Sequence, residues 1–342
     1  MPYTITARKG EKVKQCFFVT GYIGEGAKRM LSDLQSLENV RLMDRVIDNK
    51  YMRFLYYRCN RFTNGFQKCH FLKKLFYPWF TLLRTHYDER DENYILFLNS
   101  GFCRELDITV VERLKKKNKK LKLVLYIVDP MVGFSAPEHM EIIEKMDLVY
   151  SINKSDCEKY GFQYYPLVYS REPYKEAEES SAMQGEPETD LYYLGSGVDR
   201  TEALNQIYQK CSLEGIKTDF HVLGREQKQA EAAVTFHKSA ISYSKNIELL
   251  KRTNCILEIM HEDFDNPTQR YSEAVVYNKK LLTNNKKTVT FDFYDPKYMQ
   301  VFQSVNEIDT NFIKSRENVD YGYREEFSPI FLIREIANVS EG

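Results

Sequence analysis

Three side chains between Thr268 and Glu273 have types and spacing that suit the binding of a nucleotide. They belong to the stretch NPTQRYSEAVVYNKKLLTNN, residues 266–285. Phosphates bind where a helix N-terminus offers free N–H groups and the positive end of its dipole. A Thr268 hydroxyl and an Arg270 guanidinium beside that terminus would add donors, the second of them charge-assisted. Arg270 and Glu273 share a helix face, so a carboxylate there could accept both hydroxyls of a ribose.

Helix capping explains the same stretch without any ligand. Asn266 is predicted as the N-cap, Pro267 as the first helical residue, and Gln269 takes a position typical of a capping box. Capping and phosphate binding are compatible, because one helix end can do both. The local residues therefore leave a capped helix and a ligand site open.

The elements that must hold these residues alternate between strand and helix. Nearly continuous apolar runs predict strands at 12–20, 93–99, 121–129, 147–152 and 164–170. Amphipathic segments predict helices near 25–36 and at 108–118, 137–146 and 154–161, the last ending in a glycine as a C-cap. Alternation with continuously apolar strands favours a parallel sheet covered on both faces.

The alternation starts afresh after an acidic stretch at 171–189, which has little apolar content and predicts a linker. Strands are predicted at 190–196, 217–224, 255–260 and 279–285, and helices at 200–215, 246–254 and 267–278. The fold class is therefore α/β, with two Rossmann-like domains facing across a cleft. We expect an N-terminal domain at 1–170, a second domain at 190–315 and a helical segment at 316–342, for which packing back on the N-terminal domain is one arrangement.

The order of a strand, Thr-x-Arg-x-x-Glu-Ala and Lys-Lys-Leu-Leu-Thr-Asn-Asn resembles the C-terminal domain of GT-B glycosyltransferases, chiefly bacterial enzymes that build surface polysaccharides. DLYYLGSGVDR (190–200), FHVLG (220–224) and SYSKNIELLKRTNCILEI (242–259) resemble further parts of that domain. LYIVDP (125–130) and residues 147–167 resemble the end of the acceptor domain. The sequence departs from the family where Asn266-Pro267 replaces the usual glycine, and proline lacks an N–H for a phosphate.

The resemblance implies a site and a reaction. Thr268 and Arg270 would face the donor diphosphate, Arg270 also acting catalytically, and Glu273 would bind the ribose. Residues 221–224, ending in Gly224, would lie near the base. The phosphates would be bordered from the first turn of this domain by Gly195, Ser196 and Arg200. The implied enzyme is a metal-independent hexosyltransferase or similar enzyme, without a cofactor, that uses a nucleotide-diphosphate sugar and a glycan or lipid-linked acceptor.

A catalytic base would be an Asp, Glu or His at a strand end of the N-terminal domain. Asp129 is the leading candidate, ahead of Glu25 and His139, although capping or a surface position explains each of them. No metal site is expected. Asp263 and Asp265 match the letters of a DxD motif, but they lie in the predicted donor loop and not at a strand end.

Two other functions remain open. The missing glycine and unassigned base leave room for a non-catalytic GT-B-like subunit that binds nucleotide or glycan. The turn FVTGYIGEGA (18–27) and the pair Tyr150 and Lys154 mimic a short-chain dehydrogenase or epimerase that uses NAD(P). That enzyme needs both side chains on one helix face, whereas Tyr150 falls in a predicted strand.

The segment 50–87 carries eight Lys or Arg, no Asp or Glu, and twelve aromatic residues. It could lie on an anionic membrane surface, or form a solvated helix pair whose aromatic side chains are buried. Nucleic acid is not expected as a partner, because the net charge of the chain is zero and no RRM, KH or zinc pattern occurs.

Composition fits a cytoplasmic protein, with the inner face of the membrane as a second, peripheral position. The seven cysteines are scattered and form no CxxC pair, which suits a reducing compartment. The N-terminal residues have no apolar core of a signal peptide, and no apolar run approaches the about 18 residues that span a bilayer.

Overall fold

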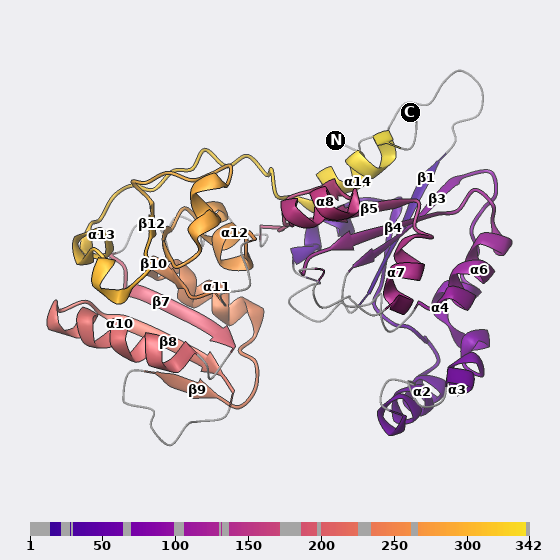
Figure 1. The fold of residues 1–342 in the computed structure, drawn as a ribbon, viewed down its shortest axis with the longest axis horizontal. Coiled ribbons are helices and arrows are strands. Elements are labelled where there is room, and N and C mark those ends of the chain that lie inside the picture. Colours follow the sequence, from indigo (N-terminus) through magenta and orange to yellow (C-terminus); the bar gives the residue numbers. More distant parts are fainter. Residues whose placement is uncertain are drawn as a thin grey trace. The chain divides into compact units, whose positions relative to one another are not determined.

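The computed structural model describes residues 14–21, 28, 30–63, 70–98, 106–129, 131, 137–171, 186–196, 200–224, 234–260 and 266–339. The chain divides into two compact units. Unit 1 contains Met1–Pro166 and Pro329–Gly342, and unit 2 contains Leu167–Ser328. Each unit is built on a parallel sheet (Figure 1). No helix among the described residues is both long enough and apolar enough to cross a membrane.

Unit 1 has, in the described residues, a six-stranded sheet of order β2-β1-β3-β4-β5-β6, with every pair parallel. Its central strands are buried along nearly their whole length, as the continuous apolar runs predict. The strands are β1 (Gln15–Thr20), β2 (Val40–Met43), β3 (Glu92–Leu98), β4 (Lys122–Ile127), β5 (Leu148–Ser151) and β6 (Gln163–Tyr164). The accompanying helices are η1 (Ser32–Ser36), α6 (Ile108–Lys117), α7 (Pro137–Ile143), α8 (Lys154–Tyr160) and α14 (Pro329–Val339).

A helical insertion separates β2 from β3 in unit 1. It comprises α2 (Lys50–Phe62), α3 (His70–Lys74), η2 (Tyr77–Trp79) and α4 (Thr81–Arg84). Asn49 caps α2, and the insertion is tied to the unit where the Thr81 N–H donates to the carbonyl of Val46 at 2.8 Å. Among the aromatic side chains of segment 50–87, Tyr56 and Tyr77 are buried in the core. Other aromatic side chains of the same segment stay exposed, so burial accounts for only part of them.

Unit 2 has, again in its described part, a six-stranded parallel sheet, of order β12-β11-β10-β7-β8-β9. The strands are β7 (Thr189–Ser196), β8 (Thr218–Leu223), β9 (Thr235–His237), β10 (Thr253–Glu258), β11 (Lys280–Thr283) and β12 (Met299–Val301). The helices are α10 (Thr201–Leu213), α11 (Tyr243–Lys251), α12 (Gln269–Val276), η5 (Lys286–Thr290), η6 (Val305–Glu307) and α13 (Thr310–Lys314). The α/β class with two parallel sheets is confirmed.

In each sheet, successive strands are added on one side of the first strand and then on its other side. In unit 2, β8 and β9 extend to one side of β7, and β10 to β12 extend to the other. Ligands of open α/β sheets bind outside the carboxyl ends of the strands at such a switch point. In unit 1 the corresponding point lies between β1 and β3. Gly21 follows β1 there with φ +137°, and a Cβ on it would lie 2.9 Å from the Leu98 carbonyl oxygen, so this turn requires glycine.

Some predicted elements differ from the observed ones. The strand expected at 164–170 is limited to the end of β6 at Tyr164, and Pro166 cannot donate to a sheet ladder. The short strands β2, β9 and β12 were not predicted, because three or four residues carry little periodic signal. Tyr150 lies in β5 and Lys154 opens α8. The two side chains therefore do not share the helix face that the dehydrogenase alternative needs. Most of the predicted linker, 172–185, and the glycine turn at 22–27 lie outside the described residues.

Candidate functional site

A buried carboxylate, Glu258, ends the strand that precedes the predicted donor loop. Its Oε2 accepts a hydrogen bond of 2.5 Å from the Thr283 hydroxyl of the next strand, and its Oε1 accepts one from the Thr268 hydroxyl. Burial raises the pKa of Glu258, and the two hydroxyls oppose that rise. The charges of Arg270 and Arg200 oppose it too. Both guanidinium groups therefore act on one carboxylate at the carboxyl edge of the sheet.

Thr268, and not Asn266, is the N-cap of α12. Its backbone is extended, and its Oγ1 accepts hydrogen bonds from the N–H groups of Arg270 at 3.0 Å and Tyr271 at 3.3 Å. Asn266 lies before the helix, where its carbonyl accepts a 3.1 Å hydrogen bond from the Asn285 side chain. The predicted capping box at Asn266 was therefore wrong. Since the Thr268 hydroxyl also donates to the buried carboxylate, it fixes the start of the helix.

Arg270 and Glu273 share a face of α12, as predicted, and they pair with each other. Arg270 Nη1 donates to Glu273 Oε2 and, at 3.1 Å, to Asn246 Oδ1. Glu273 Oε1 accepts hydrogen bonds of 3.1 Å from the side chains of Asn246 and Gln269. Asn246 Oδ1 also accepts the Tyr192 hydroxyl at 3.0 Å. The two residues thus belong to a buried polar network that joins β7, α11 and α12.

Electrostatics within this network keep the Arg270 guanidinium charged. Burial alone lowers the pKa of Arg270, but the adjacent Glu273 carboxylate reverses that effect and raises it overall. Burial raises the pKa of Glu273, and Arg270 opposes that rise. The Glu273 side chain is 0% exposed. A ribose therefore reaches its carboxylate only if a neighbouring side chain moves, and the ribose contact stays a prediction.

The remaining predicted donor residues lie along the same edge of the sheet of unit 2. Gly195 and Ser196 end β7, opposite Val222 and Leu223 of β8, and Arg200 stands directly before α10. Residues 197–199, between Ser196 and Arg200, lie outside the described part of the chain. Because β7 adjoins β10, the first turns of α10 and α12 start from neighbouring strands. Both turns therefore lie at one edge of the sheet, and the phosphate role of Gly195, Ser196 and Arg200 stays a prediction.

The predicted base-binding segment begins with His221, which pairs with His237 of β9. His221 Nδ1 lies 2.8 Å from His237 Nε2, and the other His221 nitrogen lies 2.9 Å from the carboxylate of Asp219. Burial and the neighbouring His221 lower the pKa of His237. Gly224 follows β8 with φ +154°, and its N–H donates to the His237 carbonyl at 3.0 Å. The segment is thus held to β9, and its role toward a nucleotide base stays a prediction.

Comparison with known proteins identifies the fold. No protein-family model matches the chain, and no curated protein matches it. Among solved structures, it is similar to a UDP-forming α,α-trehalose-phosphate synthase from Burkholderia xenovorans in complex with glucose-6-phosphate, with a TM-score of 0.55, 11% identity, and coverage of 96% of this chain and 100% of that one. An α-glucosyltransferase in complex with UDP and a DNA 13-mer gives a TM-score of 0.52 at 9% identity, covering 97% and 100%. The chain has the GT-B fold.

Two residues of this polar edge of unit 2 were missed from the sequence. Asn246 and Glu258 carry no local motif, and their side-chain partners lie 10 to 54 residues away along the chain. The position of Glu258 at the end of the strand before the donor loop is the one signal that could have suggested it. Asp129, the predicted base, belongs to unit 1, where it is exposed two residues after β4. Its role stays a prediction. Asp263 and Asp265 lie outside the described residues.

The two lysines of the KKLLTNN block hold the GT-B unit together. Lys279 Nζ donates to the carbonyls of Lys251 at 2.7 Å and Thr253 at 2.8 Å, at the end of α11. Lys280 Nζ donates to the Ser315 carbonyl at 2.6 Å and hydroxyl at 3.0 Å, after α13. The two ammonium groups therefore donate hydrogen bonds to backbone carbonyls where α11 and α13 end beside the sheet. They fix the position of β11 and hence of Thr283.

The buried position of Lys279 should make the free energy of unfolding depend on pH. Burial lowers its pKa to about 8, below the about 10.4 of an unfolded lysine. Between these values the unfolded chain binds more protons than the folded one, so the free energy of unfolding rises with pH. We expect wild type to gain about 2–3 kcal/mol more than Lys279→Met between pH 7.5 and 10, measured by urea unfolding. The exposed Lys287→Met is the control. Equal pH slopes in wild type and Lys279→Met would contradict the assignment.

Proposed function

We propose that the chain is a glycosyltransferase that transfers a sugar from a nucleotide-diphosphate sugar to a hydroxyl of a glycan or lipid-linked acceptor in surface polysaccharide synthesis. The observation that carries this proposal is that phosphate-binding groups converge at the switch point of the sheet in unit 2. Two arginines, Arg200 and Arg270, act on one edge beside the N-terminus of α12. Guanidinium groups and helix N-termini are the donors that bind phosphate in proteins.

The donor is proposed to be a nucleotide-linked sugar, with UDP tested first. Two structurally similar proteins support this choice, since one is UDP-forming and the other is in complex with UDP. Arg270 would contact the diphosphate, while Thr268 would hold the first turn of α12 in place. Gly195, Ser196 and Arg200 would border the phosphates, with Gly224 near the base.

The proposed chemistry is electrostatic. As the sugar leaves, negative charge develops on the diphosphate, and a guanidinium fixed nearby stabilises that charge without reorganising. Arg270 is suited to this role because its partners Glu273 and Asn246 hold it in one place. Asp129 is the proposed base that would remove the proton of the acceptor hydroxyl. We propose that these groups act without a metal.

A non-catalytic binding subunit is the second candidate, and one observation favours it. Arg270 and Glu273 are paired with each other within the described structure, and Glu273 has no exposed surface. A chain of this kind would bind a nucleotide without turning it over. Release of free nucleoside diphosphate from a panel of nucleotide sugars separates the two functions, because only a transferase releases it continuously when acceptor is present.

A thermal-shift screen tests the donor assignment directly. A ligand that binds only the folded state adds about 2.7 kcal/mol of stability at one hundred times its Kd. We expect UDP or a UDP-sugar to raise the Tm, and Arg270→Ala to reduce the shift. GDP-, ADP- and CDP-linked ligands test the base. If no nucleotide sugar raises the Tm, the proposed donor site is wrong. A rise in Tm with NAD(P) alone would favour the dehydrogenase alternative.

The acceptor is proposed to be presented at the inner face of a membrane. A growing surface glycan is carried there on a lipid, so a cytoplasmic enzyme that extends it would work as a peripheral protein. The segment 50–87, which is rich in Lys, Arg and aromatic residues, supports this position.

A further inference from the structure

Helix α2 has two faces of opposite character. The inner face is anchored by Tyr56, whose ring makes edge contacts with Phe76 at 5.4 Å and Phe80 at 5.6 Å between centroids. The outer face exposes large aromatic side chains to solvent, among them Phe54 at 61% and Phe62 at 80%. We use the name α2–α3 face for a set of exposed side chains from α2, from α3 and from the residue directly after α3: Tyr51, Phe54, Tyr57, Arg58, Arg61, Phe62, Phe71 and Leu75.

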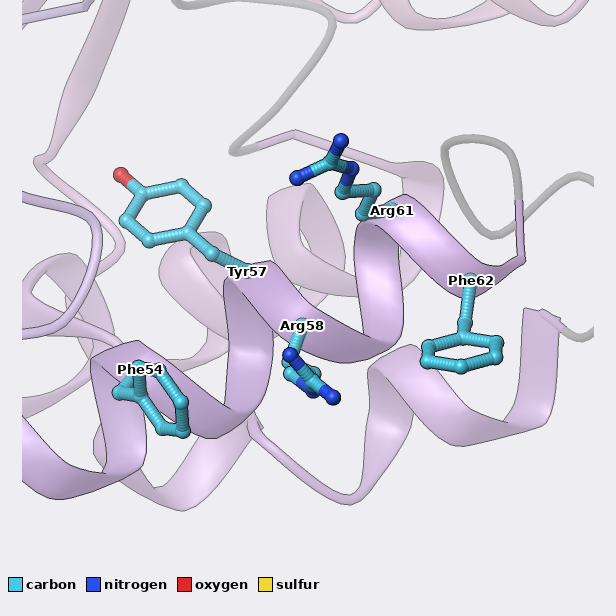
Figure 2. Close-up of a pocket in the computed structure, with 5 residues that line it drawn as sticks. All are labelled: Phe54, Tyr57, Arg58, Arg61 and Phe62. Carbon is cyan, nitrogen blue, oxygen red and sulfur yellow. The ribbon is translucent and has the colours of Figure 1, made fainter.

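Aromatic and basic side chains alternate along this face. Figure 2 shows Phe54, Arg58 and Phe62 in one row, four residues apart, and Tyr57 with Arg61 in a second row beside it. The Arg58 guanidinium lies 5.9 Å from the centre of the Phe62 ring. Together these side chains line an open hollow of about 620 Å³. The α2–α3 face therefore combines apolar surface and positive charge in one layer.

The charge of the surroundings selects the kind of partner. Lys50 to Tyr87 contains eight basic residues and no acidic one; Lys73 is buried and pairs with Asp107, whereas Lys50, Lys74 and Arg84 are exposed. Within the described part of the chain, neither Arg58 nor Arg61 pairs with a carboxylate. Exposed clusters of large apolar side chains mark interaction sites. A helix that presents aromatic rings and arginines on the same side suits a membrane surface, where rings enter the headgroup boundary and arginines meet lipid phosphates.

We propose that the α2–α3 face binds a membrane surface rich in anionic lipid. Phe54, Phe62 and Phe71 would enter the boundary between headgroups and acyl chains, and Arg58 and Arg61 would contact the phosphates. The inward side of α2 stays packed in unit 1, so the helix lies along the membrane plane without unfolding. This inference deepens the peripheral position of the proposed transferase, but its test needs neither donor nor acceptor, so the two proposals fail separately.

Co-sedimentation of the full chain with lipid vesicles tests the proposal. We expect binding to vesicles of 70% phosphatidylcholine and 30% phosphatidylglycerol, weaker binding to pure phosphatidylcholine, and release by salt, since charges are screened over about 8 Å at physiological ionic strength. Arg58→Gln with Arg61→Gln should weaken binding about 25-fold, at about fivefold per cation. Phe54→Ser with Phe62→Ser should abolish it. Thermal unfolding should change little in both variants, because the side chains are exposed.

Matched controls keep the test specific to the face. Leu213→Ser removes an apolar side chain that is 90% exposed on α10, and Lys116→Gln with Lys119→Gln removes the same charge as the arginine pair. Both controls should bind like wild type. Binding that is equal for neutral and anionic vesicles, or equal for the face variants and wild type, overturns the proposal. It is also overturned if Phe54→Ser with Phe62→Ser converts a dimer to a monomer while wild type binds no vesicle.

Discussion

Arg270→Ala is expected to lower the rate of sugar transfer by about 10²- to 10³-fold, the loss typical of removing one preorganised donor to a developing charge. The reason is the position of the guanidinium at the N-terminus of α12, held by Glu273 and Asn246. The measurement is the release of nucleoside diphosphate at saturating donor and acceptor. The control is Arg252→Ala, because Arg252 is half-exposed and pairs with Glu248 on the surface of α11.

Stability must be separated from catalysis in this variant. Removing Arg270 leaves Glu273 buried without its cation, and breaking a buried pair costs about 3–5 kcal/mol. We therefore expect Arg270→Ala to unfold at a lower denaturant concentration than wild type. The double variant Arg270→Ala with Glu273→Gln removes the stranded charge and should recover part of that stability, while transfer stays low. Turnover near the wild-type value in the folded fraction of Arg270→Ala would remove the phosphate role.

The fold could be predicted largely because long apolar runs leave few alternatives. The runs that became β3, β4 and β10 are too short for buried helices within an alternating chain and too continuously apolar for half-exposed strands. The edge strand β9, with three residues, gives no such signal. Exposure of the α2–α3 face could not be predicted either, since the sequence places aromatic residues on both sides of α2 and tertiary packing decides which side is buried.

The site could be predicted only where its geometry is local. The spacing of Arg270 and Glu273 places them on one face of α12, and the structure confirms that. Their shared partner Asn246 comes from α11, because the sheet brings that helix beside α12. No local pattern encodes such a contact. The N-cap shows the same limit: Asn266 and Thr268 are both good caps, and the choice of Thr268 follows from the Glu258 carboxylate that its hydroxyl meets.

Glu273→Gln is expected to weaken nucleotide binding by about tenfold or more and to do so equally for UDP and 2′-deoxy-UDP. The geometry gives Glu273 the role of a positioning residue, because its carboxylate is buried and accepts hydrogen bonds from Arg270, Asn246 and Gln269. A hydrogen bond to a charged group contributes about 1.5–3 kcal/mol. Losing it lets the guanidinium leave its place beside the diphosphate, whatever the sugar of the nucleotide.

The comparison of the two nucleotides by calorimetry decides between this role and the ribose contact that the GT-B resemblance implies. If Glu273 binds the ribose, Glu273→Gln should weaken binding of UDP more than binding of 2′-deoxy-UDP, which keeps only one of the two hydroxyls. That result would mean that the network around Glu273 opens when donor binds. An equal loss would instead assign the ribose to another group and make Glu273 part of the support for Arg270. Gln269→Ala, which removes a neutral donor to the same carboxylate, should change both affinities only slightly. A large effect there would show that the orientation of Glu273 itself limits binding.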